Sequence, residues 1–180
     1  MDEDKVYRSI QGLRAPERLA ILEADRVASL TLQDHKTQSA LDVGTGSGIF
    51  AEVFVGLGID VMGIDIQEPM LAAARKLVPG ARFELGSAEA LLFTDGSFDL
   101  CFLGLILHES SSPLRTLQEA HRVASKRVAV LEWPYKEQEM GPPLDHRLKA
   151  EDVLHQASAI GFSHTQAIPL EYLVLFLLDK

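Results

Sequence analysis

The chain has 180 residues, of which 47% are hydrophobic and 24% are charged, as expected for one globular domain of ordinary size. Its formal net charge of −9 argues against a nucleic acid as partner and against electrostatic binding to an anionic membrane surface. The acidic start lacks the apolar core of a signal peptide, and the stretch YLVLFLL is too short to span a membrane, so we expect a cytoplasmic protein without membrane insertion.

Segments with apolar residues at helical spacing alternate along the chain with short, continuously apolar segments. We expect helices over residues 15–32, 47–58, 69–78, 112–124 and 148–162. We expect strands over residues 39–43, 60–66, 81–86, 97–107, 126–133, 164–168 and 171–178. Prolines near the starts of three of these helices, Ser112 as a cap, and Gly58 and Gly161 at helix ends support these boundaries.

Alternating strands and helices predict a parallel sheet covered on both faces. The last two expected strands are joined by a short turn near Pro169, and strands joined in that way must be antiparallel. The expected fold class is therefore α/β, with a doubly wound, mostly parallel sheet and one antiparallel strand near the C-terminus. Cys101, the single cysteine, falls within a strand and is expected to be a buried apolar residue, which excludes a disulfide framework and a multi-cysteine metal site.

The stretch ALDVGTGSGIF, residues 40–50, joins the first expected strand to a helix. Its glycines permit a tight turn and a close approach of a ligand to the backbone. A Walker P-loop is excluded because no lysine follows, and the pattern G-x-G-x-x-G fits poorly because the third glycine is out of register. Asp65, at the end of the next strand, can bind both ribose hydroxyls or instead cap the following helix. A nicotinamide dinucleotide and S-adenosylmethionine both remain open at this point.

Longer segments decide between these ligands: LDVGTGSGIF, GIDIQEPML, GSAEALLFTDGSFDLCFLGLILHE and LQEAHRVASKRVAVLEW. Together they resemble the class I S-adenosylmethionine-dependent methyltransferases, in particular the small bacterial branch similar to ubiquinone and menaquinone biosynthesis enzymes (methyltransferase type 11). The resemblance covers residues 38–134 closely and continues in the tail GPPLDHRL…VLHQASAIGF. It implies a three-layer Rossmann-like sheet of about seven strands. It also implies one domain over residues 1–180, with an N-terminal helical cap (1–37) and a core (38–180).

The resemblance implies S-adenosylmethionine as the cofactor, with S-adenosylhomocysteine as its product. Asp42 would hold the methionine amino group, directly or through water, while Gly44, Gly46 and Gly48 would let the methionine part lie over the loop. Asp65 would bind the ribose. The full implied set of cofactor-binding residues is Asp42, Gly44, Thr45, Gly46, Gly48, Asp65, Ile66, Met70, Ser87, Ala88, Leu103 and Gly104.

The adenine end of this implied site departs from the family pattern. Ile66 and Met70 would pack on the adenine, although Met70 suits a helix core equally well. Ser87 and Ala88 match the pair that reads the adenine edge, but the family more often has Asp where Ser87 stands. A hydroxyl binds the exocyclic amine more weakly than a carboxylate does. Glu89 is expected to cap the short turn, and Leu103 with Gly104 would lie beside the sulfonium.

Methyl transfer from a sulfonium needs positioning and removal of water more than acid–base chemistry. A base is required only if the acceptor loses a proton, and His108 and Glu109 are the candidates because they follow the fourth strand. The alternative is that His108 has no catalytic role and only shapes the pocket. Trp133, Tyr135, His146 and Arg147 line either an acceptor pocket or an ordered crossover loop. Tyr7, Arg8 and the helix after Pro16 could cover the cofactor as a lid.

The sequence thus predicts a methyltransferase that acts on an unidentified small-molecule acceptor, as a monomer or homodimer. A second hypothesis is a non-catalytic module, or inactive partner subunit, that binds S-adenosylmethionine or S-adenosylhomocysteine. A third, an NAD-dependent oxidoreductase, lacks the third glycine in register and a Tyr-x-x-x-Lys pair.

Overall fold

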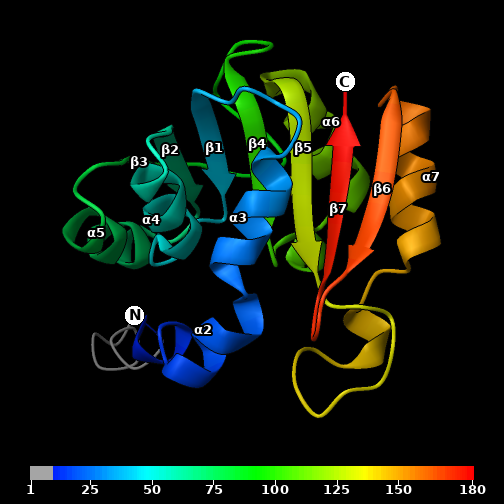
Figure 1. The fold of residues 1–180 in the computed structure, drawn as a ribbon, viewed down its shortest axis with the longest axis horizontal. Helices are drawn as coiled ribbons and strands as arrows, with labels where there is room; N and C mark the ends of the chain where they lie inside the picture. Colours follow the sequence, from blue (N-terminus) through cyan, green and yellow to red (C-terminus); the bar gives the residue numbers. More distant parts are fainter. Residues whose placement is uncertain (1–9) are drawn as a thin grey trace.

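The structure is a computed structural model that describes residues 10–180. A single seven-stranded sheet runs through the molecule in the order β3-β2-β1-β4-β5-β7-β6 (Figure 1). Its strands are β1 (Ser39–Val43), β2 (Asp60–Asp65), β3 (Arg82–Leu85), β4 (Phe98–Gly104), β5 (Ala124–Glu132), β6 (His164–Pro169) and β7 (Val174–Asp179). The first five strands pair in parallel, and β7 lies antiparallel between β5 and β6. The predicted fold class, including the inserted antiparallel strand, is confirmed.

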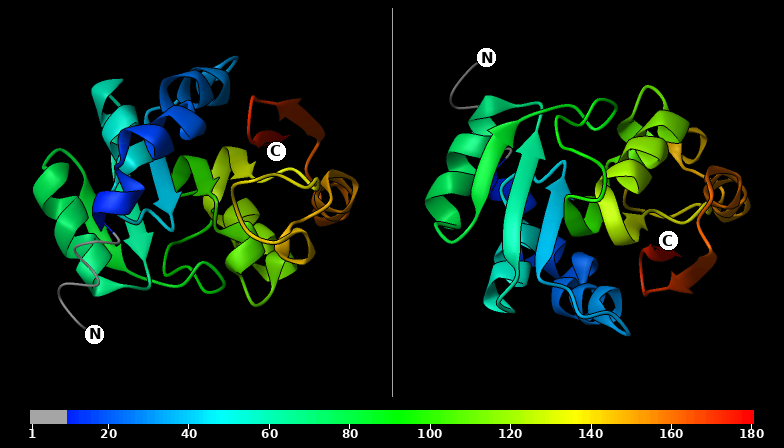
Figure 2. Two further views of the ribbon diagram at one scale, coloured as in Figure 1. Left: turned by 90° about the horizontal axis from the view of Figure 1, so that it is seen from below. Right: turned by 90° about the horizontal axis from the view of Figure 1, so that it is seen from above.

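Helices cover both faces of the sheet. They are α2 (Pro16–Leu22), α3 (Ala24–Leu32), α4 (Ile49–Gly56), α5 (Glu68–Leu77), α6 (Pro113–Val123) and α7 (Ala150–Ile160), with 3-10 turns η1 (Leu107–Glu109) and η2 (Leu144–His146). Views from above and below place α3 and α4 on one side of the sheet and α6 on the other (Figure 2). Within residues 10–180, no helix is long and apolar enough to cross a membrane.

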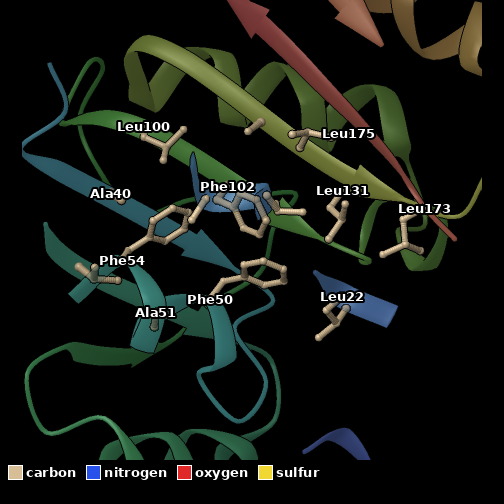
Figure 3. Packing of buried hydrophobic residues seen from close by; sticks show 14 of the residues in the cluster. Leu22, Ala40, Phe50, Ala51, Phe54, Leu100, Phe102, Leu131, Leu173 and Leu175 are labelled. Carbon is tan, nitrogen blue, oxygen red and sulfur yellow. The ribbon is translucent and has the colours of Figure 1, made fainter. Parts of the chain in front are cut away.

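Alternation of side chains along the central strand β4 separates two cores. Leu100 and Phe102 pack on the α3–α4 side, where the Phe102 ring centroid lies 4.5 Å from that of Phe50 and 5.4 Å from that of Phe54 (Figure 3). Cys101 and Leu103 point to the opposite core, beneath α6 and α7. Cys101 is fully buried, as predicted, and burial raises the pKa of its thiol. The strand is apolar throughout because both of its faces are covered.

One long helix was predicted over residues 15–32, and this prediction is wrong. The helix breaks at Glu23, which has a left-handed backbone with φ of 44°. Its carboxylate accepts hydrogen bonds from Arg26 and from the backbone N–H of Glu171, 148 residues away in the chain. A contact so distant in sequence overrides the local helical pattern. The proposed division into a cap (1–37) and a core stays a prediction, and Ile21, Leu22, Val27 and Ala28 pack into the same core as the sheet.

The strand predicted over residues 97–107 is shorter than expected. It ends at Gly104, because Leu105 adopts φ of 59° and donates its N–H to the Leu131 carbonyl at 2.8 Å. The apolar residues that follow continue into η1 instead of extending the sheet. This bend brings His108 back toward the end of β5.

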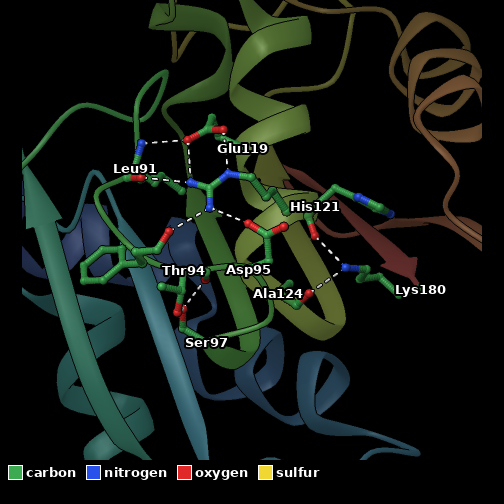
Figure 4. Close-up of polar contacts among 10 residues, drawn as sticks. Leu91, Thr94, Asp95, Ser97, Glu119, His121, Ala124 and Lys180 are labelled. Atoms are coloured by element: carbon green, nitrogen blue, oxygen red, sulfur yellow. Dashed lines mark hydrogen bonds and ion pairs between the residues drawn. The ribbon is translucent and has the colours of Figure 1, made fainter.

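The connection from β3 to β4, residues 86–97, crosses the sheet without a helix. Arg122 of α6 holds it: the guanidinium donates to the carbonyl oxygens of Leu91 and Phe93 and pairs with Asp95 and Glu119 at 2.7–2.9 Å (Figure 4). Glu119 also accepts from the N–H of Leu91 at 2.8 Å. Side-chain contacts from α6 therefore fix the middle of this crossover, residues 91–95.

Candidate active site

Two adjoining clefts open at the carboxyl ends of β1, β2 and β4, where doubly wound sheets bind their ligands. The first cleft has a volume of about 300 Å³ and is lined by Gly44, Asp65, Ile66, Gln67, Gly86, Ser87, Ala88, Glu89, Ile106, Glu109, Ser110 and Ser111. The second has about 310 Å³ and is lined by Leu13, Arg18, Leu22, Asp42, Gly44, Thr45, Gly46, Ser47, Ile49, Phe50, Asp65, Gln67, Met70, Gly104, Leu105, Ile106 and Glu109. Because Gly44, Asp65 and Glu109 line both, the clefts share a wall.

The glycine loop between β1 and α4 has the backbone that its sequence predicts. Gly44, Gly46 and Gly48 have φ of 69°, 54° and 80°, a region that other residues rarely adopt. A Cβ on Gly44 would lie 2.3 Å from Cγ2 of Ile106, so a side chain there cannot fit without movement. Gly48 lies outside both clefts, and a Cβ on it would lie 3.1 Å from Cγ2 of Val78.

Asp65, at the end of β2, is fixed at the wall that the clefts share. One carboxylate oxygen accepts the N–H of Gly46 at 2.9 Å, and the other accepts the N–H of Gln67 at 2.9 Å. The first bond ties the carboxylate to the glycine loop, and the second ties it to the start of α5. Each oxygen retains accepting capacity, because a carboxylate offers about four lone-pair sites.

Asp42, at the end of β1, is buried at the bottom of the second cleft. Thr45 Oγ1 donates to its Oδ2 at 2.6 Å. Burial raises the pKa of Asp42 to about 6, with the charge of Asp65 acting in the same direction and the Thr45 hydrogen bond opposing it. A buried carboxylate of this kind favours a cationic group in the cleft beside it.

The residues predicted for the adenine end lie in the two clefts. Ile66 is 71% exposed on the wall of the first cleft, with Ser87 and Ala88, whereas Met70 lines the second and is only 7% exposed. The Ser87 hydroxyl accepts the N–H of Glu89 at 3.3 Å.

Glu89 and Leu103 act differently from the expectation. The Glu89 side chain accepts the N–H of Ser112 at 3.0 Å, so it braces the start of α6 and not its own turn. Leu103 is fully buried in the core beneath α6 and lines neither cleft, whereas its neighbour Gly104 lines the second.

His108 lines neither cleft, although its neighbour Glu109 lines both, and it is hydrogen-bonded to Glu132, a residue that the sequence did not indicate. Nδ1 of His108 is 2.7 Å from Oε2 of Glu132, and the His108 backbone N–H donates to Oε1 at 3.1 Å. Nε2 lies 3.8 Å from Oε1 of Glu109, whose side chain is 73% exposed. Burial lowers the pKa of His108, but the hydrogen bond to Glu132 and the charges of Glu132 and Glu109 outweigh it, so that the pKa is raised.

The long segment after β5 is an ordered loop held by Arg147. This buried guanidinium donates to the carbonyl oxygens of Pro134, Lys136, Met140 and Pro142. It also lies 5.7 Å from the ring centroid of the buried Trp133. Of the predicted acceptor residues, Trp133 and Arg147 therefore build the loop. Tyr135 lines a separate hollow, and His146 is exposed on η2.

The N-terminal segment closes the second cleft with Leu13, Arg18 and Leu22. This agrees with the predicted cover by the helix after Pro16, whereas Tyr7 and Arg8 lie outside the described residues. The sequence carries no local signal for Arg18 or Glu132, because each meets its neighbours only through the folding of distant segments.

The parallel order β3-β2-β1-β4-β5 and a glycine loop at the carboxyl ends of these strands are those of a Rossmann-like α/β protein. The family described as "Methyltransferase domain" matches residues 41–131. The chain belongs to this family, and the resemblance to the class I S-adenosylmethionine-dependent methyltransferases is confirmed.

Individual relatives agree with this family. The chain is 36% identical over 124 residues to malonyl-[acyl-carrier protein] O-methyltransferase of Erwinia billingiae, covering 69% of this chain and 49% of that protein. It is 35% identical over 86 residues to demethylmenaquinone methyltransferase of Renibacterium salmoninarum, covering 48% of this chain and 36% of that protein. The chain thus spans half or less of the length of these relatives.

A solved S-adenosylmethionine-dependent methyltransferase from Aquifex aeolicus matches over the whole length. Its TM-score is 0.83 at 25% identity, with 99% of this chain and 98% of that chain covered. The described fold therefore resembles a methyltransferase of the same extent.

Proposed function

We propose that the protein is an S-adenosylmethionine-dependent methyltransferase that acts on a small-molecule acceptor. Asp65 carries the proposal, because this carboxylate is fixed by the N–H groups of Gly46 and Gln67 where the two clefts meet. A ribose between an adenine in one cleft and a methionine in the other would meet that carboxylate. When bound, the cofactor supplies a methyl group on a positively charged sulfur, which becomes a neutral thioether after transfer.

The residues of the clefts fit this cofactor chemically. Ile66, Ser87 and Ala88 offer an apolar surface and a hydroxyl to the adenine, and Asp65 offers acceptors to the ribose hydroxyls. In the second cleft, there is room beside the backbone of Gly46, since a Cβ on it would have its nearest neighbour 3.9 Å away. Thr45, Met70 and Gly104 line this cleft as well.

The second cleft, proposed for the methionine part, is lined by one buried acid, Asp42, and one half-buried cation, Arg18. Asp42 is suited to an ammonium group because burial disfavours its charge unless a cation lies near. Arg18 makes no hydrogen bond or ion pair within residues 10–180, and its guanidinium lies 5.5 Å from the ring centroid of Trp133. We assign Arg18 to the methionine carboxylate, since an arginine suits a carboxylate geometrically.

His108 and Glu109 are proposed to face the acceptor. Glu109 lines both clefts, and Nε2 of His108 lies 3.8 Å from it. The relatives named for malonyl-[acyl-carrier protein] and demethylmenaquinone support an acceptor that is a metabolite or is carried by a protein, and leave its identity open.

Calorimetric titration with S-adenosylmethionine, S-adenosylhomocysteine and NAD tests this proposal. Micromolar binding of both sulfur compounds, at least tenfold weaker in Asp65→Ala and absent for NAD, is the expected result. Asp145→Ala, which changes an exposed aspartate on η2, is the matched control and should bind like the wild type. Binding of NAD alone would contradict the proposal. Binding of the sulfur compounds without turnover across a broad acceptor screen would favour the non-catalytic module.

A further inference from the structure

Glu132, the last residue of β5, is a buried carboxylate with an unusual set of partners. It is 1% exposed and accepts three hydrogen bonds, from the backbone N–H and Nδ1 of His108 and from the backbone N–H of Trp133 at 3.2 Å. Within residues 10–180, its only ion-pair partner is His108. A buried carboxylate destabilises a fold unless it is paired. Even when it is paired, replacing the ion pair with apolar residues of similar volume often leaves a protein equally stable or more stable. This arrangement therefore points to a functional role for the pair.

The pairing dictates the state of the imidazole. A carboxylate only accepts hydrogen bonds, so Nδ1 of His108 must carry its proton toward Glu132. In the neutral ring, the lone pair then belongs to Nε2. Nε2 lies 3.8 Å from Oε1 of Glu109, a residue that lines both clefts, although His108 itself lines neither.

The backbone around His108 is held independently of the side chain. Leu105 bends the chain after β4, and its N–H bonds to Leu131 of β5. Ser110 donates to the Ile106 carbonyl at 3.1 Å, and Thr116 of α6 donates to the Ser110 hydroxyl at 3.1 Å. The ring is therefore fixed both by its own turn and by Glu132.

We propose that Glu132 is a positioning residue that holds His108 as the proton acceptor of methyl transfer, so that the acceptor is a group that loses a proton, such as a hydroxyl, a thiol or an acidic C–H. This inference rests on the proposed function. As the acceptor atom bonds to the methyl carbon, its proton moves to Nε2 of His108. The electron pair of the broken carbon–sulfur bond stays on the sulfur, and Glu132 stabilises the imidazolium that forms.

A cofactor pair that differs by one charge tests this without knowing the acceptor. S-adenosylmethionine carries the sulfonium charge, S-adenosylhomocysteine does not, and both carry the amino group that Asp42 would meet. An imidazolium facing the methyl group repels only the first. We therefore expect the ratio of the two dissociation constants, methyl donor over product, to fall roughly tenfold as the pH rises through the titration of His108, which corresponds to about one pKa unit.

Variants test whether His108 and Glu132 cause this fall in the ratio of dissociation constants. His108→Gln should abolish it, whereas His155→Gln, which changes an exposed histidine of α7, should retain it. Glu132→Gln should move its midpoint to lower pH, because the group that raises the pKa of His108 is lost, while Glu132→Asp should restore part of the shift. The other charges that act on His108 are Glu109 and Arg147, and Arg18 acts on Glu109; all three are unchanged in these variants.

The possible results distinguish a failure of the inference on His108 and Glu132 from a failure of the proposed function. A ratio that is flat in the wild type, or that falls equally in His108→Gln, would overturn the role of His108. An unchanged midpoint in Glu132→Gln would overturn that of Glu132. Nitrogen chemical shifts of the wild type give a test free of variants: the neutral ring should be the Nδ1–H form, and the Nε2–H form would refute the pairing. If neither ligand binds at any pH, the proposed function itself fails.

Discussion

Arg14 of the N-terminal segment is bonded directly to Ser47 of the glycine loop. Its guanidinium donates to the Ser47 carbonyl at 2.8 Å and to the Ser47 hydroxyl at 3.3 Å, and pairs with Glu52 of α4 at 2.7 Å. The segment that carries Leu13 and Arg18 over the second cleft is therefore fastened to the loop beneath it. Cofactor affinity should depend on this contact although Arg14 does not line the cleft.

Replacing Arg14 with Ala should weaken the binding of S-adenosylhomocysteine about 3- to 10-fold, because two hydrogen bonds that order the cover are lost. Glu52→Gln is the control: it removes only a partly exposed ion pair and should change affinity by less than about twofold. Calorimetry measures both. An equal loss in the two variants would mean that the ion pair, and not the bond to Ser47, orders the segment.

Replacing Arg18 with Gln should weaken the binding of S-adenosylhomocysteine by about tenfold. The binding of 5′-methylthioadenosine, which lacks the amino-acid part, should be unaffected. The reason is that the half-buried guanidinium has no hydrogen-bond partner within the described residues and is assigned to the methionine carboxylate. Competition binding with the two compounds checks this. Equal losses for both compounds would refute the assignment.

Replacing Gly44 with Ala should abolish cofactor binding and lower the free energy of unfolding by about 2–4 kcal/mol, since strain at φ of 69° adds to a clash with Ile106. Gly96→Ala separates the two causes. Gly96 has φ of 64°, but its added Cβ would approach nothing closer than 3.8 Å. Gly96→Ala should lower the free energy of unfolding by only about 1 kcal/mol. Urea unfolding of both variants measures the difference, and equal costs would show that the clash with Ile106 is relieved.

The pH dependence of stability should carry the signature of Asp42. Its folded pKa of about 6 lies above its ordinary value of 3.8, so the folded state binds more protons between these values. The contribution of Asp42 therefore falls by about 2 kcal/mol as the pH rises from 4 to 7. Asp42→Asn should remove this dependence of the free energy of unfolding on pH. Toward neutral pH the variant should become more stable relative to the wild type, while its affinity for the cofactor is lost. Urea unfolding at each pH tests this, and parallel curves for the two proteins would contradict it.

Replacing Arg122 with Ala should release the crossover of residues 86–97 and cost about 2 kcal/mol, because its bonds to the carbonyl oxygens of Leu91 and Phe93 and to Glu119 are lost together (Figure 4). Asp95→Asn removes only an 81% exposed partner and should be nearly neutral. Hydrogen exchange of residues 91–97 should accelerate in the first variant alone. Unchanged exchange there would mean that apolar contacts of Leu91 and Phe93 suffice.

The sequence alone determined the order of the strands, the doubly wound sheet and the place of the glycine loop at the carboxyl end of β1. These features depend on local chemistry. Ser112 caps α6 through the N–H of Arg115, Gly161 ends α7 at φ of 115°, and the glycine loop needs backbone angles that other residues avoid. Such signals act within a few residues, so they can be read before folding is considered.

Only the tertiary structure decided the features that depend on distant partners. The break at Glu23 is held by Glu171, and the pairing of His108 with Glu132 joins the ends of two strands. The bond from Arg14 to Ser47 likewise spans 33 residues. No local pattern encodes these pairs, because each residue is an ordinary choice for its own segment. For His108 and Glu132, the proximity follows from the parallel register of β4 and β5, which brings the carboxyl ends of these two strands side by side.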